Sequence, residues 1–149
     1  MSADTTAVPV LTIEELTTFL REAFPGTPID EQFQILNLSA GRLDMTLTSS
    51  MRQLRPGDVI GGPTQMALAD AAMYALVLGH IGKLAMAVTT SLTMHFLRPA
   101  RQGALFAEAT MLKLGTRAAT GNVFLWTDDR STPCAHAVVA YALPPRTFK

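Results

Sequence analysis

The chain has 149 residues, enough for one domain with a sizeable core, and twelve basic side chains balance twelve acidic ones. This balance gives no electrostatic reason to expect a nucleic-acid or membrane partner. Hydrophobic residues make up 48% of the chain and charged residues only 16%, against about 25% charged in a typical soluble domain. We therefore expect a single domain, residues 1–149, whose excess apolar surface is covered in a homo-oligomer.

The cysteine content and the first residues restrict the class of protein further. The single cysteine, Cys134, excludes an internal disulfide and a cysteine-based zinc site. No glycine-rich phosphate loop or dinucleotide-binding fingerprint is present, so we expect neither a metal nor an organic cofactor. The start of the chain lacks the basic and apolar regions of a secretory signal. We expect a cytoplasmic protein in which residues 1–10 are a mobile lead.

The first predicted element is an amphipathic helix that begins after Thr12 and ends before Pro25-Gly26. Thr12 and Glu15 have the spacing of a capping box, in which each side chain accepts the other residue's backbone N–H.

Two alternating segments, residues 31–39 and 42–49, follow this helix and are separated by Ala40-Gly41. This pattern predicts a β-hairpin. Residues 52–58, which include Pro56-Gly57, are predicted to form a polar loop that leads into the next helix.

Residues 61–79 are predicted to form one helix, around which the rest of the chain is organised. Gly62-Pro63 suits the first turn, and Gly79 suits the end. Between Met66 and Leu78 the only charged residue is Asp70, and a helix that is apolar nearly all round belongs in a core. Alanines that recur every four residues predict a narrow stripe on which a sheet can pack closely: Ala67, Ala71 and Ala75.

Asp70 is unusual in this helix, because an ionised carboxylate is costly in apolar surroundings unless it is paired, hydrogen-bonded or neutralised. It lies roughly two turns from the helix start, so the helix dipole stabilises it little. Two interpretations stay open. Asp70 is either a structural carboxylate that reaches solvent or a neighbouring strand, or a functional one at a cleft or subunit boundary.

Four further strands are predicted after the helix. In residues 88–97 the apolar side chains Val88, Leu92, Met94 and Phe96 share one face, and the polar side chains Thr89, Ser91, Thr93 and His95 share the other. The remaining strands, residues 104–114, 118–127 and 134–143, are joined by short turns. Short turns between consecutive strands predict an antiparallel sheet, and helices on one face of it make the fold α+β.

Three segments of this pattern carry a family resemblance: Leu68-Ala69-Asp70, Phe96-Leu97-Arg98-Pro99-Ala100 and Leu112-Lys113-Leu114-Gly115. Together they resemble the hotdog-fold acyl-CoA thioesterases, most nearly the phenylacetate-pathway (PaaI-like) branch. The resemblance implies an antiparallel sheet wrapped around a central buried helix, here with an extra N-terminal helix. It also implies a homodimer, or a homotetramer built as a dimer of dimers. The implied activity is hydrolysis of an acyl or aryl-acyl thioester to free acid and CoA.

The resemblance assigns roles to individual residues. Asp70 matches the family's catalytic carboxylate, as nucleophile or general base. Gly62 matches the glycine whose backbone N–H polarises the thioester carbonyl. Thr89 matches a hydroxyl residue on the partner subunit that helps to place the water, so we expect Thr89 to face a partner's Asp70. The family's His-Gly-Gly reads Gly61-Gly62-Pro63 here, and the imidazole is therefore missing.

Elementary chemistry agrees with two of these roles. A free N–H at a helix start is a preorganised donor for the charge that develops on a thioester oxygen, and Gly62 leaves room for the ligand. Asp70 can activate water as a base or attack the carbonyl itself, and the sequence does not choose between these routes.

Six residues are candidates for substrate binding: Gly61, Pro63 and Met66 near the helix start, and Arg98, Lys113 and Arg117 at strand ends and turns. The three cations can supply charge for the phosphates of CoA. Solvated surface explains the cations equally well, and a place in the core explains Met66.

An alternative function is a hotdog oligomer that binds acyl-CoA or another apolar ligand without turnover, since a fold does not determine function. Gly61 in place of the histidine favours this alternative, and the retained Asp70 favours the enzyme. A dehydratase is less favoured, because the helix offers no histidine to pair with its acid.

Overall fold

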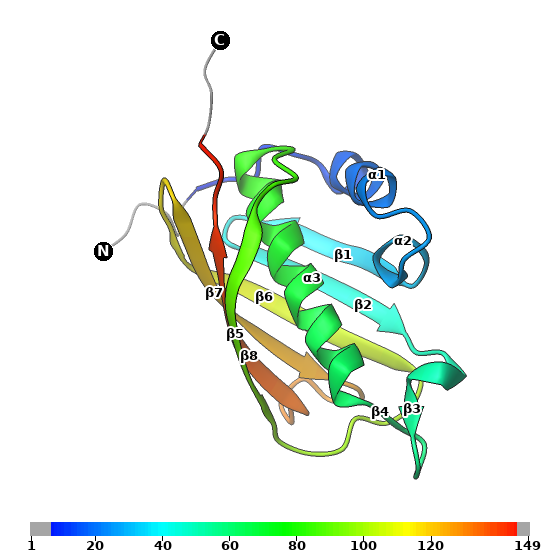
Figure 1. Cartoon of the computed structure of the whole chain (residues 1–149). Helices are drawn as coiled ribbons and strands as arrows, with labels where there is room; N and C mark the ends of the chain where they lie inside the picture. The colour runs from blue at the N-terminus through cyan, green and yellow to red at the C-terminus, as the bar shows by residue number, and fades with distance from the viewer. Residues whose placement is uncertain (1–6, 146–149) are drawn as a thin grey trace.

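The computed structural model describes residues 7–145. Within these residues, six strands form one antiparallel sheet, and a long helix, α3, lies across it (Figure 1). In sheet order the strands are β1 (Phe33–Ser39), β2 (Arg42–Thr48), β6 (Ala104–Leu114), β7 (Ala118–Trp126), β8 (Ala135–Ala142) and β5 (Val88–Phe96). The sheet curves around α3 (Gly62–Ile81), so the predicted α+β architecture with a central helix is confirmed.

The N-terminal helix, α1 (Ile13–Ala23), forms as predicted. The Glu15 N–H donates to Thr12 Oγ1 at 3.1 Å, and the Thr12 N–H donates to Glu15 Oε1 at 2.9 Å, which completes the capping box. Leu16 and Leu20 are buried, and they anchor α1 beside α3 over the β1 end of the sheet (Figure 1). A short helix that the sequence analysis did not predict, α2 (Pro28–Glu31), follows α1.

The predicted loop before α3 contains more structure than expected. After a 3-10 turn over Met51–Gln53, the strands β3 (Leu54–Arg55) and β4 (Val59–Ile60) pair as a small antiparallel hairpin. The Gly61 N–H then donates to Gln53 O at 3.0 Å, so this hairpin holds the chain at the point where α3 begins.

α3 is buried along most of its length and runs past the predicted end. It ends at Ile81, and the residue that caps it, Gly82, has a φ of 104° that favours glycine. Gly79 lies inside the helix, where a Cβ atom would stand 3.3 Å from the Leu38 side chain. Its carbonyl oxygen accepts the Val10 N–H at 2.7 Å, so Val10, at the end of the predicted mobile lead, contacts α3. Residues 1–6 of that predicted lead lie outside the described residues.

The predicted alanine stripe does not pack against the sheet along its whole length, because Ala67 and Ala71 line a cavity. Ala67 is exposed, and only Ala75 of the three is completely buried. The close packing of helix and sheet also requires a glycine in the sheet, because a Cβ on Gly121 of β7 would lie 2.6 Å from the Met73 sulfur. Gly121 of the sheet therefore lies opposite Met73, a large side chain of the helix.

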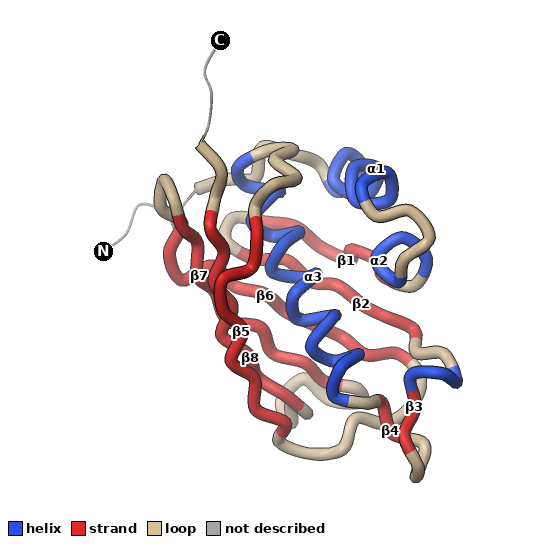
Figure 2. The backbone as a smooth tube through the Cα atoms, viewed as in Figure 1, coloured by secondary structure: helices blue, strands red, loops and turns tan. Residues whose placement is uncertain are grey.

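β5 forms one edge of the sheet (Figure 2). Its pairing with β8 contains a β-bulge. Thr89 pairs with Tyr141 and Ser91 pairs with the adjacent Ala140, so Thr90 is the extra residue. A bulge reverses the alternation of side chains, and Thr89 therefore shares a face with Leu92 and the other helix-facing residues. The prediction that Thr89 lies on the polar face is wrong for this reason.

Within the described residues, no helix is long and apolar enough to cross a membrane.

Candidate functional site

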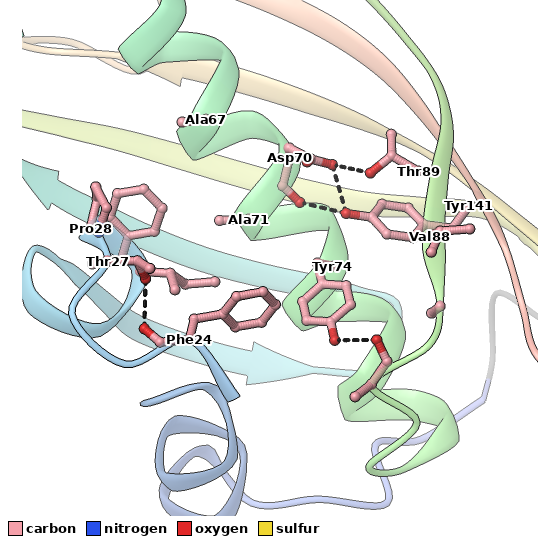
Figure 3. Close-up of a pocket in the computed structure, with 14 residues that line it drawn as sticks. Phe24, Thr27, Pro28, Ala67, Asp70, Ala71, Tyr74, Val88, Thr89 and Tyr141 are labelled. Atoms are coloured by element: carbon pink, nitrogen blue, oxygen red, sulfur yellow. Dashed lines mark hydrogen bonds between the residues drawn. The ribbon is translucent and has the colours of Figure 1, made fainter. Parts of the chain in front are cut away.

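Asp70 projects from α3 into a cavity of about 450 Å³ that lies between α3, the start of β5 and the α1–α2 segment (Figure 3). The lining is mainly aromatic and aliphatic: Phe24, Pro28, Ile29, Phe33, Ala67, Ala71, Tyr74, Ala85, Ala87, Val88 and Tyr141, with Thr27, Asp70 and Thr89. Asp70 supplies the only charged side chain among these lining residues. An apolar cavity with few, well-placed polar groups is typical of a small-molecule site.

Two hydroxyl groups hold the Asp70 carboxylate. Thr89 Oγ1 donates to Asp70 Oδ1 at 2.7 Å, and the Tyr141 hydroxyl donates to the same oxygen at 2.6 Å (Figure 3). Within residues 7–145, Asp70 makes no ion pair, so hydrogen bonds stabilise its charge. Of the ways in which a carboxylate can be stabilised in apolar surroundings, hydrogen bonding is therefore the one observed for Asp70.

The contact between Thr89 and Asp70 lies within one chain. We predicted that Thr89 would face the Asp70 of a partner, and this is corrected by the 2.7 Å bond. The cause is the bulge at Thr90, which turns Thr89 toward its own helix.

Tyr141 was not among the predicted site residues. Its side chain is 3% exposed and stands at the register position opposite Thr89. Burial, reinforced by the nearby Asp70 charge, raises the pKa of the Tyr141 phenol well above its ordinary value. The available sequence signal was one phenol in a strand that otherwise contains alanines, valines and one histidine, Ala135-His-Ala-Val-Val-Ala-Tyr-Ala142.

Two further aromatic rings form part of the cavity wall. Phe24 and Tyr74 meet edge to face, with ring centroids 5.6 Å apart, and the Tyr74 hydroxyl donates to Ala85 O at 3.0 Å. Burial also raises the pKa of Tyr74. Because its hydroxyl already has a partner, Tyr74 presents an apolar ring to the cavity.

Gly62 is the first residue of α3, and its N–H makes no hydrogen bond among the described residues. A separate cavity of about 470 Å³ lies at this point, lined in part by Gly62, Arg55, Phe96 and Arg98. A Cβ on Gly62 would stand 3.3 Å from the Phe96 ring. Gly62 therefore has a backbone N–H that is free to bind a ligand, and the Phe96 ring leaves little room for a side chain at this position.

The other residues near the helix start that were predicted to bind substrate, Gly61, Pro63 and Met66, are less well placed to do so. A Cβ on Gly61 would stand 3.5 Å from Arg55 Cγ, so the Arg55 side chain lies beside the position of the missing imidazole. Pro63 is exposed and Met66 is 41% exposed, and neither lines the Asp70 cavity.

One chain does not bring Gly62 and Asp70 together. They are eight residues apart on α3, which corresponds to about 12 Å along the axis. A carbonyl group hydrogen-bonded to the Gly62 N–H is thus out of reach of the carboxylate in the same chain.

The three predicted phosphate-binding cations are also separated. Arg98 follows β5 and lines the cavity beside Gly62, with its Nε donating to Pro133 O at 3.0 Å. Lys113 and Arg117 are exposed near the opposite end of the sheet, where β6 turns into β7. The strand pairing places Lys113 level with Ser91 of β5. Arg98 follows Ser91 by seven residues, so it lies about 20 Å from the level of Lys113 along the strand direction.

The chain is similar to known thioesterases both in sequence and in structure. The sequence model of the thioesterase superfamily matches residues 57–134, more than half of the chain. A candidate thioesterase from Silicibacter sp. TM1040 is 38% identical, with a TM-score of 0.85 over 94% of this chain and 96% of the other. Comparison with curated proteins found no match.

More distant structures share the fold. Zebrafish thioesterase superfamily member 2 is 16% identical, with a TM-score of 0.77 over 90% of this chain and 99% of the other. A mutant of the phenylacetic acid degradation protein PaaI from Thermus thermophilus is 22% identical, with a TM-score of 0.65 over 76% and 94%. The resemblance to hotdog thioesterases is thereby confirmed.

Proposed function

Because the chain belongs to the thioesterase superfamily and is a thioester hydrolase, we propose that it hydrolyses the thioester of an acyl-CoA or aryl-acyl-CoA to the free acid and CoA. The observation that carries this proposal is Asp70. It is a partly buried carboxylate in an apolar cavity, and two hydroxyl groups hold it by one oxygen.

Asp70 Oδ2 is the oxygen that does the chemistry. As a general base it takes a proton from water, the water oxygen adds to the carbonyl carbon, and the C–S bond breaks to release the CoA thiolate, which then takes up a proton. As a nucleophile it adds to the same carbon and expels the thiolate, and water then hydrolyses the resulting anhydride. Both routes use the same cavity and the same oxygen.

The oxyanion donor comes from a second copy of the chain. β5 is an exposed edge strand of nine residues, which is a template for pairing with another strand. Its first part contacts Asp70 through Thr89, and its last residue, Phe96, lies against Gly62. Antiparallel pairing of two β5 edges places the start of one strand opposite the end of the other. The Gly62 N–H of one copy then faces the Asp70 cavity of its partner, which a single chain does not allow.

The acyl group occupies the aromatic cavity beside Asp70, because this cavity is apolar apart from the groups that hold the carboxylate. Of the three predicted cations, Arg98 is the best placed for the CoA phosphates, since it borders the cavity at Gly62 and Lys113 and Arg117 do not. The assembly is a homodimer or a homotetramer. The cytoplasmic location stays a prediction of the sequence.

The test is a panel of acetyl-, octanoyl-, palmitoyl-, benzoyl- and phenylacetyl-CoA, assayed by release of free thiol from wild type and from Asp70→Asn. We expect at least one substrate to turn over, and Asp70→Asn to lower its kcat by about 10²–10⁴-fold, the usual effect of a positioned acid or base. Asp129→Asn, a matched change in the turn between β7 and β8, is the control and should keep the wild-type rate. An Asp70→Asn protein that hydrolyses at the wild-type rate per folded molecule contradicts the proposal.

A further inference from the structure

The two oxygens of the Asp70 carboxylate are in different environments. Oδ1 accepts hydrogen bonds from both Thr89 and Tyr141 (Figure 3). Oδ2 accepts none from any residue that the structure describes. Donors stabilise the negative charge on the oxygen that they contact, so Oδ1 is the anchored oxygen and Oδ2 is the reactive one.

The Tyr141 hydroxyl can donate one proton, and its geometry shows where that proton goes. It lies 2.6 Å from Asp70 Oδ1 and 3.1 Å from the backbone carbonyl oxygen of the same residue. The carboxylate is closer and charged, so it takes the proton. One phenol oxygen thus lies against both the side chain and the backbone of Asp70, which restricts the rotation of the carboxylate.

The phenol ring is itself held in place. It is almost completely buried, and its centroid lies 5.8 Å from that of Tyr74, one helical turn after Asp70. The raised pKa of Tyr141 keeps the hydroxyl protonated, and therefore a donor, over the pH range in which a thioesterase works.

We propose that Tyr141 is a positioning residue for thioester hydrolysis, which holds Asp70 by Oδ1 so that Oδ2 faces the acyl cavity as an anion. This inference rests on the proposed function. It adds no chemical step, because Tyr141 keeps its proton throughout and acts only through Asp70. It holds for both routes, since a base and a nucleophile need the same oxygen in the same orientation.

The first test is Tyr141→Phe, which removes one oxygen atom and keeps the ring. We expect kcat to fall by about 10- to 100-fold, the effect of losing one hydrogen bond to a charged group, with KM changed less than about threefold. Because the carboxylate anion has lost a donor, the acid limb of the pH–rate profile should move to higher pH. Tyr74→Phe, which removes the other buried phenol hydroxyl of the cavity, should lower the melting temperature and leave the acid limb in place.

The second test uses the Asp70→Asn background. If Tyr141 acts through Asp70, adding Tyr141→Phe to Asp70→Asn should change the residual rate less than about twofold. Replacing Tyr141 with 3-fluorotyrosine keeps the ring and strengthens the donor, and it should move the acid limb to lower pH. This variant keeps the inference testable even if Tyr141→Phe folds poorly.

Three outcomes would overturn the inference. One is a Tyr141→Phe protein with the wild-type kcat and acid limb. Another is a loss of rate that is equally large in the Asp70→Asn background. Both leave the proposed function intact as long as Asp70→Asn alone is inactive. If Asp70→Asn alone is fully active, the proposed function and this inference fall together.

Discussion

The proposed division of the site between two copies of the chain can be tested by mixing two inactive variants. Asp70→Asn removes the reactive carboxylate, and Gly62→Pro removes the N–H donor at a helix position that accepts proline. A Cβ at position 62 would stand 3.3 Å from the Phe96 ring, which is 50% exposed and can move by a few tenths of an ångström. Each variant should therefore fold, which circular dichroism and the melting temperature will check.

The expected activities follow from the geometry of α3. Because Gly62 and Asp70 of one chain are about 12 Å apart, each site of the proposed arrangement needs the glycine of one copy and the aspartate of another. Each variant by itself lacks one group at every site, and its kcat should fall below about 1% of wild type. In an equal mixture that reassorts at random, about one quarter of the sites carry both native groups, so we expect about a quarter of the wild-type activity.

The assay is acyl-CoA hydrolysis by the mixture after subunit exchange, with the most active substrate of the panel. Different affinity tags on the two variants show independently that mixed oligomers have formed. Mixed oligomers whose activity does not exceed that of the separate variants would refute the shared site. A chain that sediments only as a monomer at micromolar concentration would refute it as well.

Three further outcomes are expected. Arg98→Ala should raise KM for an acyl-CoA about tenfold and barely change KM for the corresponding acyl-pantetheine, which lacks the nucleotide; equal effects on both would exclude a phosphate contact. Gly121→Ala should destabilise the fold by about 1–3 kcal/mol, measured by urea unfolding, because the methyl group would overlap the Met73 sulfur, whereas Gly61→Ala has room and should be neutral. The unfolding free energy should fall as the pH rises above about 10, because the raised pKa of Tyr141 leaves the folded state with more protons than the unfolded state. Tyr141→Phe should flatten this decline.

Much of the local structure follows from the sequence, because its causes lie within a few residues. The Thr12–Glu15 spacing defines the start of α1, and the capping box is present as predicted. A long apolar segment with one charge predicts a buried helix that presents a carboxylate, and α3 with Asp70 is that helix. Strand positions follow from alternation and turns, and the six strands of the main sheet end within two residues of the predicted ranges.

Only the tertiary structure decided how these elements form a site. The Thr90 bulge depends on which residues of β8 pair with β5, so no local pattern shows that Thr89 faces Asp70. Tyr141 is 71 residues from Asp70 in the chain, and their contact exists only because β8 and β5 lie side by side next to α3. The sequence places Gly62 and Asp70 on one helix, but the 1.5 Å rise per residue separates them by about 12 Å, which makes a second copy of the chain part of the proposed site.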